Sequence, residues 1–327
     1  MAKKIDQDKL QAKIEARNER EYERKHKRKT KRTWKDVIFN IINYGVFTVF
    51  TLSCIFPFYY IFINTISRRD LVSKGQITIF PKGVHFDNYI GILNTPEISD
   101  AFLVSVSRTI IGTALMVAAT GLIGYLVTKN EMWNRKIWYR FIVITMYFNA
   151  GLVPWYMNMS TLGLTNTFAA YIIPGIVAPY NIILVKTYIE SIPAELEESA
   201  FMDGASFFTV FRKIIWPLSK PILATIAIFG AVGHWNSYTD SLILMTKAPK
   251  LHTLQHLLYE VLKGLQNLQD SFNSGNPAAM LNAAENAMSG TIMNYTISMA
   301  SVIPILLVYP FMQRYFEKGI MLGAVKG

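Results

Sequence analysis

The sequence predicts an all-α polytopic membrane protein with six transmembrane helices. Hydrophobic residues make up 51% of its 327 residues, whereas charged residues make up only 17%, and soluble domains average about 25%. The apolar residues are gathered into six segments, at 37–63, 101–128, 137–158, 167–189, 221–244 and 291–313. A spanning helix needs about 20 predominantly apolar residues, so each segment is a candidate span.

A strongly basic tail, residues 1–36, precedes the first segment. It holds many of the cations behind the formal net charge of +11. Basic residues beside a first span are typical of the cytoplasmic side and of attraction to anionic lipid. This explains the charge without nucleic acid, although the tail alone does not exclude RNA binding. Cleavage of a signal peptide near Cys54 is disfavoured because the apolar run continues through Ile63.

The short connections predict the orientation. Those after the second and fourth segments carry Lys and Arg, whereas 159–166 after the third carries neither. Basic short loops stay in the cytoplasm, so both termini should be cytoplasmic in a bacterial plasma membrane, with the longer segments 64–100 and 245–290 outside. The external segment 64–100 also carries cations, but long loops constrain orientation less.

The fourth apolar segment and the external segment 245–290 each contain a further structural signal. The fourth segment contains Pro174, Gly175 and Pro179, so a kinked or unwound helix is expected there. The external segment 245–290 contains a helical pattern from Leu251 to Leu268. His252 and His256 stand four residues apart in it, the spacing of a metal pair. We favour a solvated helix face, because no third ligand is evident.

The cytoplasmic segment 193–220 is longer than a simple connection and is patterned as a helix-turn-helix. Pro193 is expected to open the first helix, with Ser191 as its cap. Gly204 should end or bend that helix, and an apolar face from Phe207 to Ile215 should follow until Pro217 stops the pattern. Such an element, lying along the membrane surface, is typical of a docking site.

The stretch from Glu198 to Ala205, together with Trp216-Pro217-Leu218, resembles the EAA loop of permeases in binding-protein-dependent ABC importers. Ser199 and Trp216 depart mildly from that pattern. The run from His234 to Tyr238 and the ending Gln313 to Gly327 resemble the carbohydrate branch, which contains the maltose permease's second subunit. Within it, the importers of complex or plant oligosaccharides are the most similar subgroup.

The resemblance implies an ABC importer permease fold of type I and a set of partners. These are a second homologous permease, two ABC ATPase subunits and an extracellular solute-binding lipoprotein, which the 245–290 loop would touch. The helix Pro193 to Met202 would be the coupling helix seated on the ATPase. The residues expected to couple are Glu195, Glu198, Ser199, Ala200, Asp203, Gly204, Ala205 and Pro217.

The chain itself should not hydrolyse ATP, because it lacks a loop of the form G-x-x-x-x-G-K-[ST]. ATP and magnesium would be bound by the partner ATPases, and no cofactor or metal is expected in this chain. An ion-coupled secondary transporter is the main alternative. It should show inverted repeats and intramembrane acidic residues, and only Asp240 is a candidate.

Aromatic and planar polar side chains in the third and fifth spans predict an oligosaccharide path, although an interfacial belt explains many of them equally well. The predicted path residues are Arg108, Tyr147, Asn149, Trp155, Asn158, Trp235, Asn236, Tyr238 and Asp240. Arg108 is the sharpest case, because a charge inside a span is costly. It could attract a uronic acid, but we favour a structural pairing with Asp240 or a backbone carbonyl.

Overall fold

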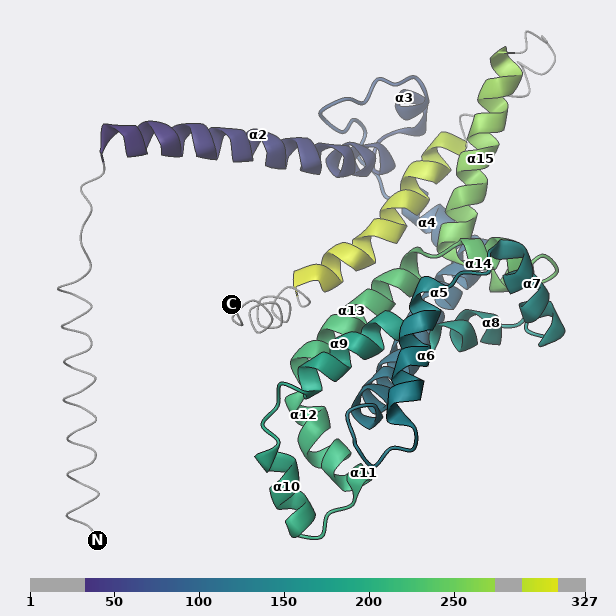
Figure 1. The fold of residues 1–327 in the computed structure, drawn as a ribbon. Coiled ribbons are helices and arrows are strands. Elements are labelled where there is room, and N and C mark those ends of the chain that lie inside the picture. Colours follow the sequence, from purple (N-terminus) through teal and green to yellow (C-terminus); the bar gives the residue numbers. More distant parts are fainter. Residues whose placement is uncertain (1–32, 274–289, 311–327) are drawn as a thin grey trace, which may run out of the picture. The chain divides into compact units, whose positions relative to one another are not determined.

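The computed structural model describes residues 33–273 and 290–310, and every regular element in these ranges is a helix (Figure 1). The chain divides into two compact units, one up to Pro57 and one from Phe58 onward. The C-terminal ending and residues 274–289 of the predicted external loop lie outside the described residues. So do residues 1–32 of the basic tail.

The first long helix, α2, runs from Trp34 to Thr65 and has a mean hydropathy of 2.0 over its most apolar stretch. It contains the whole predicted span 37–63. The backbone N–H of Thr33 donates to the Asp36 carboxylate at 2.8 Å, which satisfies a donor at the helix start. The predicted boundary of the tail at residue 36 therefore falls inside the first turn of the helix.

Helix α5, Pro96–Leu126, packs against α13, Lys220–Asn236, and α9, Pro179–Ile189. Glycines allow this close approach. A Cβ added at Gly124 would lie 2.7 Å from Cγ1 of Val185 on α9, and one at Gly112 would lie 2.5 Å from Nε2 of His234 on α13. These three helices form the frame on which the candidate sites are built.

The segment after α2, predicted to be external, folds back against the C-terminal end of α2. It contains α3, Arg69–Ser73, and α4, Asp87–Leu93. The side-chain amide of Asn88 donates to the carbonyl of Thr65 at 2.8 Å, and Nε of Arg69 donates to the Asn88 carbonyl oxygen at 2.8 Å. Hydrogen bonds of this kind fix a loop that carries no apolar span of its own.

Within the described residues, three helices are long and apolar enough to cross a membrane, namely α2, α5 and the helix Gly290–Pro310, and the number rises to five if each of two bent pairs is one span. The predicted third segment, 137–158, is two helices, α6, Arg135–Tyr147, and α7, Leu152–Thr161. They are separated at Gly151, whose φ of +90° favours glycine. The six-span count stays a prediction.

The expected interruption of the fourth segment is present. It consists of α8, Ala169–Ile172, the 3₁₀ turn η1, Ile173–Gly175, and α9, with a bend of 46°. The fifth segment ends as a separate short helix, α14, Thr239–Leu244, beyond α13. The turn η3, Pro249–Leu251, and the helix α15, Leu254–Asn273, follow, so the helix predicted from Leu251 begins three residues later.

Candidate functional site

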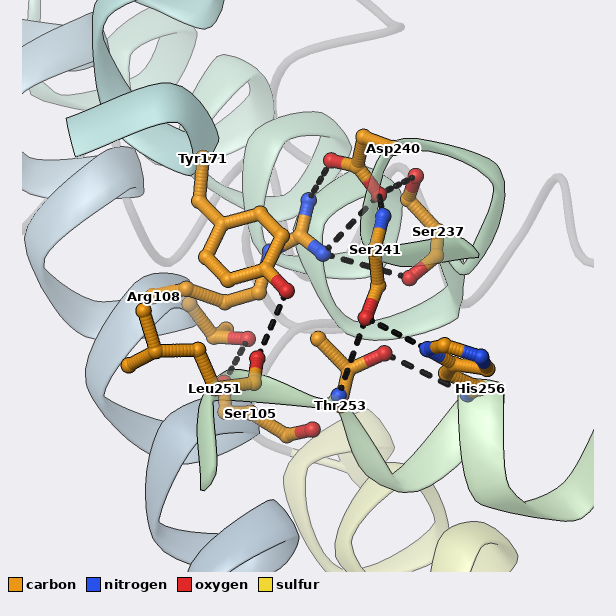
Figure 2. A network of polar contacts seen from close by, with 10 residues as sticks. Ser105, Arg108, Tyr171, Ser237, Asp240, Ser241, Leu251, Thr253 and His256 are labelled. Carbon is orange, nitrogen blue, oxygen red and sulfur yellow. Dashed lines mark hydrogen bonds and ion pairs between the residues drawn. The ribbon is translucent and has the colours of Figure 1, made fainter. Parts of the chain in front are cut away.

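A buried ion pair joins α5 to α14. The side chain of Arg108 is 2% exposed, and its guanidinium donates to both carboxylate oxygens of Asp240, at 2.5 and 3.2 Å (Figure 2). It also donates to the carbonyl of Ser237 at 3.2 Å and lies 4.4 Å from the centre of the Tyr171 ring. Both structural pairings suggested for Arg108, the carboxylate and the backbone carbonyl, are therefore present.

The ion pair continues into a wider network of hydrogen bonds. Asp240 also accepts from the Ser237 hydroxyl and from the backbone N–H of Ser241, both at 2.9 Å. The Tyr171 hydroxyl donates to the carbonyl of Leu251 at 2.6 Å, across 80 residues of sequence. These bonds fix α8, α14 and the turn before α15 against α5 (Figure 2).

A cavity of about 310 Å³ opens beside the ion pair. Aromatic faces and polar groups share its wall with the backbone of the interrupted fourth segment. The lining residues are Arg108, Trp155, Ala170, Tyr171, Pro174, Gly175, Gly230, Gly233, His234, Ser237 and Asp240. Ligand sites combine a mainly apolar wall with a few fixed polar groups, and this cavity has that composition.

Three of the predicted path residues, Arg108, Trp155 and Asp240, line this cavity. Of the others, Trp235 is buried elsewhere, where its indole N–H donates to the carbonyl of Ser301 at 3.0 Å. Tyr238 stacks on Tyr259, with ring centres 4.9 Å apart. The remaining four are exposed and do not line the cavity, namely Tyr147, Asn149, Asn158 and Asn236.

Tyr171 was not predicted to line the cavity, because its position in an apolar run does not distinguish it from a packing residue. The interruption at Pro174 and Gly175 did indicate a cavity, because broken helices at membrane depth are tolerated where they line one. A Cβ added at Gly175 would lie 3.3 Å from the His234 ring. Glycine there leaves room for the imidazole at the cavity wall.

A second candidate site is the helix-turn-helix between the fourth and fifth segments. Its first helix, α10, runs from Glu195 to Met202. Gly204 follows with a φ of +82°, in the left-handed region, and so ends the helix as predicted. The backbone N–H of Ala205 then donates to the carbonyl of Ala200 at 3.0 Å. The chain turns back into α11, Phe207–Val210, where the Ser206 hydroxyl caps the helix.

The two faces of α10 differ. On its inner face, Glu197 forms an ion pair with Lys129, and both side chains are largely buried. The Phe201 ring on the same face lies 4.9 Å from that of Phe207. On the outer face, at helical spacing, four residues are exposed, namely Glu195, Glu198, Ser199 and Met202. The helix is thus fixed on one side and open on the other.

Three details of the predicted element were wrong. The helix begins at Glu195 rather than Pro193. Ser191 does not cap it, because its hydroxyl donates back to the carbonyl of Tyr188 at 2.6 Å. Pro217 does not stop the second helix, which continues through the π-helical turn η2, Phe211–Ile215, and α12, Trp216–Leu218. The helix ends one residue after this proline, at Leu218.

The expected solvated face at His252 and His256 was also wrong. His252 lies in the turn before α15, and the side chain of His256 is only 3% exposed. Nδ1 of His256 lies 2.8 Å from the Ser241 hydroxyl (Figure 2). Burial lowers the pKa of His256, and the neighbouring His252 lowers it further. The pair faces the core beside α14.

Residues 28–322 match the family model described as binding-protein-dependent transport system inner membrane component. The chain belongs to this family. It is therefore a multi-pass membrane component of a transport system, and the family supports the permease resemblance rather than the ion-coupled alternative.

Curated relatives and a solved structure agree with this assignment. The polygalacturonan/rhamnogalacturonan transport system permease protein YtcP of Bacillus subtilis (strain 168) is 33% identical over 90% of this chain and 100% of its own length. The lactose transport system permease protein LacG of Rhizobium radiobacter is 29% identical over 88% of this chain and 96% of its own length. These relatives are permease proteins of sugar transport systems.

A chain from the crystal structure of a bacterial ABC transporter involved in the import of the acidic polysaccharide alginate matches 87% of this chain and 98% of its own length. The TM-score is 0.74 and the sequence identity is 30%. This match confirms the all-helical ABC importer permease fold for the chain. The resemblance to the carbohydrate branch is confirmed as well.

Proposed function

We propose that this chain is the transmembrane permease subunit of an ATP-driven oligosaccharide importer. It forms half of the translocation pore, with a second homologous permease as the other half. Two ABC ATPase subunits supply the energy, and an extracellular solute-binding lipoprotein delivers the sugar. The family match over residues 28–322 carries this proposal, and the two faces of α10 support it.

The outer face of α10 is the proposed contact with the ATPase. Glu195, Glu198 and Ser199 are exposed on it, and Met202 is 88% exposed. An exposed apolar side chain beside carboxylates is suited to an interface with an apolar centre and a charged rim. Ala200 of α10 and Ala205 of the turn that follows it pack instead against the hydrophobic core. They would transmit the movement of the helix rather than touch the ATPase.

The transmission path is short. The core cluster that receives Ala200 and Ala205 includes Tyr125 of α5 and Val185 of α9, both on helices that contribute to the frame. A rigid helix packed in this way can pass a displacement to its neighbours as a body. Movement of α10 would therefore reach α5 and α9 directly. In this proposal both termini lie in the cytoplasm, on the side of the ATPase.

The cavity beside Arg108 and Asp240 is the proposed oligosaccharide contact. Trp155 and Tyr171 offer aromatic faces, and His234 offers a hydrogen-bonding ring. The charge of Arg108 is compensated by Asp240, so the cavity should recognise hydroxyl groups rather than a uronate. An oligosaccharide is the substrate class that relatives named for lactose and for polygalacturonan/rhamnogalacturonan transport support.

Co-purification from the native membrane tests this proposal. The tagged chain should recover a second permease and an ATPase. The double variant Glu198→Ala with Gly204→Val should lose the ATPase and keep the second permease, because only the cytoplasmic element is altered. Glu97→Gln, at an exposed carboxylate at the start of α5, is the matched control and should keep both. Recovery of the chain alone in every case would contradict the proposal.

A further inference from the structure

Three side chains at the start of α15 are arranged as metal ligands. One ring nitrogen of His252, one of His256 and one carboxylate oxygen of Glu260 all lie within 4.8 Å of one another. The two imidazole centres are 4.1 Å apart, and Nε2 of His256 is 3.3 Å from Oε1 of Glu260. Two imidazoles and one carboxylate are a ligand set that zinc commonly adopts, with a further position left for water.

The hydrogen bonds around the two rings favour this role. Nε2 of His252 lies 3.2 Å from the carbonyl of Met245. A carbonyl can only accept, so this nitrogen carries the hydrogen and the lone pair is on Nδ1. Nδ1 of His256 lies 2.8 Å from the Ser241 hydroxyl. Oxygen partners on the outer nitrogens are the usual way in which metal-binding histidines are oriented.

The remaining nitrogen of His256 needs a partner. The side chain is 97% removed from solvent, being 3% exposed, and its Nε2 has no hydrogen-bond partner of good geometry among the described residues. Buried polar atoms are rarely left unsatisfied. The Glu260 carboxylate, 50% exposed, lies 3.3 Å from this nitrogen, as an ion-pair contact and not as a hydrogen bond of good geometry. A cation between the two would satisfy both.

We propose that His252, His256 and Glu260 form a binding site for a divalent transition metal, with Zn²⁺ as the preferred ion. The spacing of four residues from His256 to Glu260 places both ligands on one face of the helix, and His252 enters from the preceding turn. The bound ion would fix the first turns of α15 to the Met245 turn. It would also anchor Ser241, whose neighbour Asp240 binds Arg108.

Zinc binding by the complete importer tests the site. The complex is purified with an affinity tag that lacks histidine, stripped with a chelator and returned to magnesium buffer. Zinc affinity is then measured by competition with a chromogenic chelator. Glu260→Gln and His252→Gln each remove a ligand outside the buried core, so folding should survive. Loss of even an outer-shell partner weakens metal binding about 10- to 100-fold, and each of these variants should weaken it by at least about 10-fold.

Matched controls separate this site from others in the complex. His85→Gln and Glu97→Gln remove a histidine and a carboxylate elsewhere in the predicted external part, and both should bind zinc as the unmodified chain does. Zinc should also raise the thermal unfolding temperature of the unmodified complex more than that of Glu260→Gln. The site is overturned if no zinc binds, or if both ligand variants bind it as tightly as the unmodified chain.

Discussion

The guanidinium of Arg108 and the carboxylate of Asp240 lie 132 residues apart in sequence and form a two-pronged ion pair in the protein interior. Arg108 belongs to the long apolar helix α5, and Asp240 lies in the first turn of α14, the short helix beyond α13. The pair fixes these two elements beside the cavity. Neither charge is left for a ligand to neutralise, and this has consequences for stability and for specificity.

Removing either partner of the ion pair should destabilise the protein. Arg108→Ala and Asp240→Ala each leave the other charge without its partner. Breaking a fully buried pair costs about 3–5 kcal/mol, and the loss here should lie at or below that figure because the Asp240 side chain is 18% exposed beside the cavity. The double variant Arg108→Leu with Asp240→Leu removes both charges and should recover part of the loss. Thermal unfolding of the purified complex measures this. Single variants as stable as the unmodified chain would show that the pair is not buried in the assembled transporter.

The same substitution addresses substrate charge. Because Asp240 already compensates Arg108, Arg108→Ala should reduce transport of neutral and acidic oligosaccharides by the same factor. Uptake of matched neutral and uronate-containing sugars into membrane vesicles measures this. A loss confined to the acidic sugars would show that the guanidinium binds the substrate, contrary to the account.

The ion pair between Lys129 and Glu197 should hold α10 in place. Its side chains are 16% and 13% exposed, and a hydrogen bond to a charged group contributes about 1.5–3 kcal/mol. Lys129→Gln should therefore speed hydrogen exchange of the backbone amides between 195 and 202. The charge-swapped double variant Lys129→Glu with Glu197→Lys should restore part of the protection from hydrogen exchange. Unchanged exchange in Lys129→Gln would refute the role of the pair.

Substitution by alanine should lower the stability of the protein to different extents at two buried glycines. A Cβ at Gly124 would lie 3.1 Å from Cβ of Val185, part of a stiff branched side chain. A Cβ at Gly230 would lie 2.5 Å from Cε of Met116, at the end of a flexible chain that can move. Gly124→Ala should lower stability by about 1–3 kcal/mol, and Gly230→Ala by less. Thermal unfolding of both variants gives the comparison, and an equal response would contradict the packing described.

The turn after α10 should depend on its glycine. Gly204 has a φ of +82°, and a side chain in this region costs about 1–2 kcal/mol. Gly204→Ala should therefore destabilise the turn. Gly264→Ala is the control, because Gly264 lies in α15 with nothing within 4 Å of an added Cβ. It should be neutral or stabilising. The two variants are compared by hydrogen exchange across the turn and across α15.

Much of the fold followed from apolar length alone. The spans at 37–63 and 101–128 needed only a count of residues, and the break at Pro174 needed only the chemistry of proline. The division of the third segment at Gly151 was missed because the segment was judged by its overall apolar length, although Asn149 and Gly151 interrupt it. Burial of His256 was missed for another reason. Its partner Ser241 lies 15 residues away in sequence, and local patterns carry no information about such contacts.

The candidate sites show the same contrast. The turn at Gly204 was predictable because a left-handed residue leaves a local signature. The ion pair of Glu197 on the inner face of α10 was not predictable, because its partner Lys129 lies 68 residues away in sequence. Tyr171 is held at the cavity by contacts with Arg108 and Leu251, and the spacing of apolar residues in the sequence does not predict such long-range contacts.

Uptake by the reconstituted complex tests the central claim most directly. The full importer is placed in proteoliposomes with ATP and magnesium on the ATPase side, and with the binding protein and a labelled oligosaccharide on the other. The account predicts uptake that requires ATP and persists when ionophores collapse all ion gradients. Uptake that does not require ATP and is abolished by the ionophores would contradict this claim.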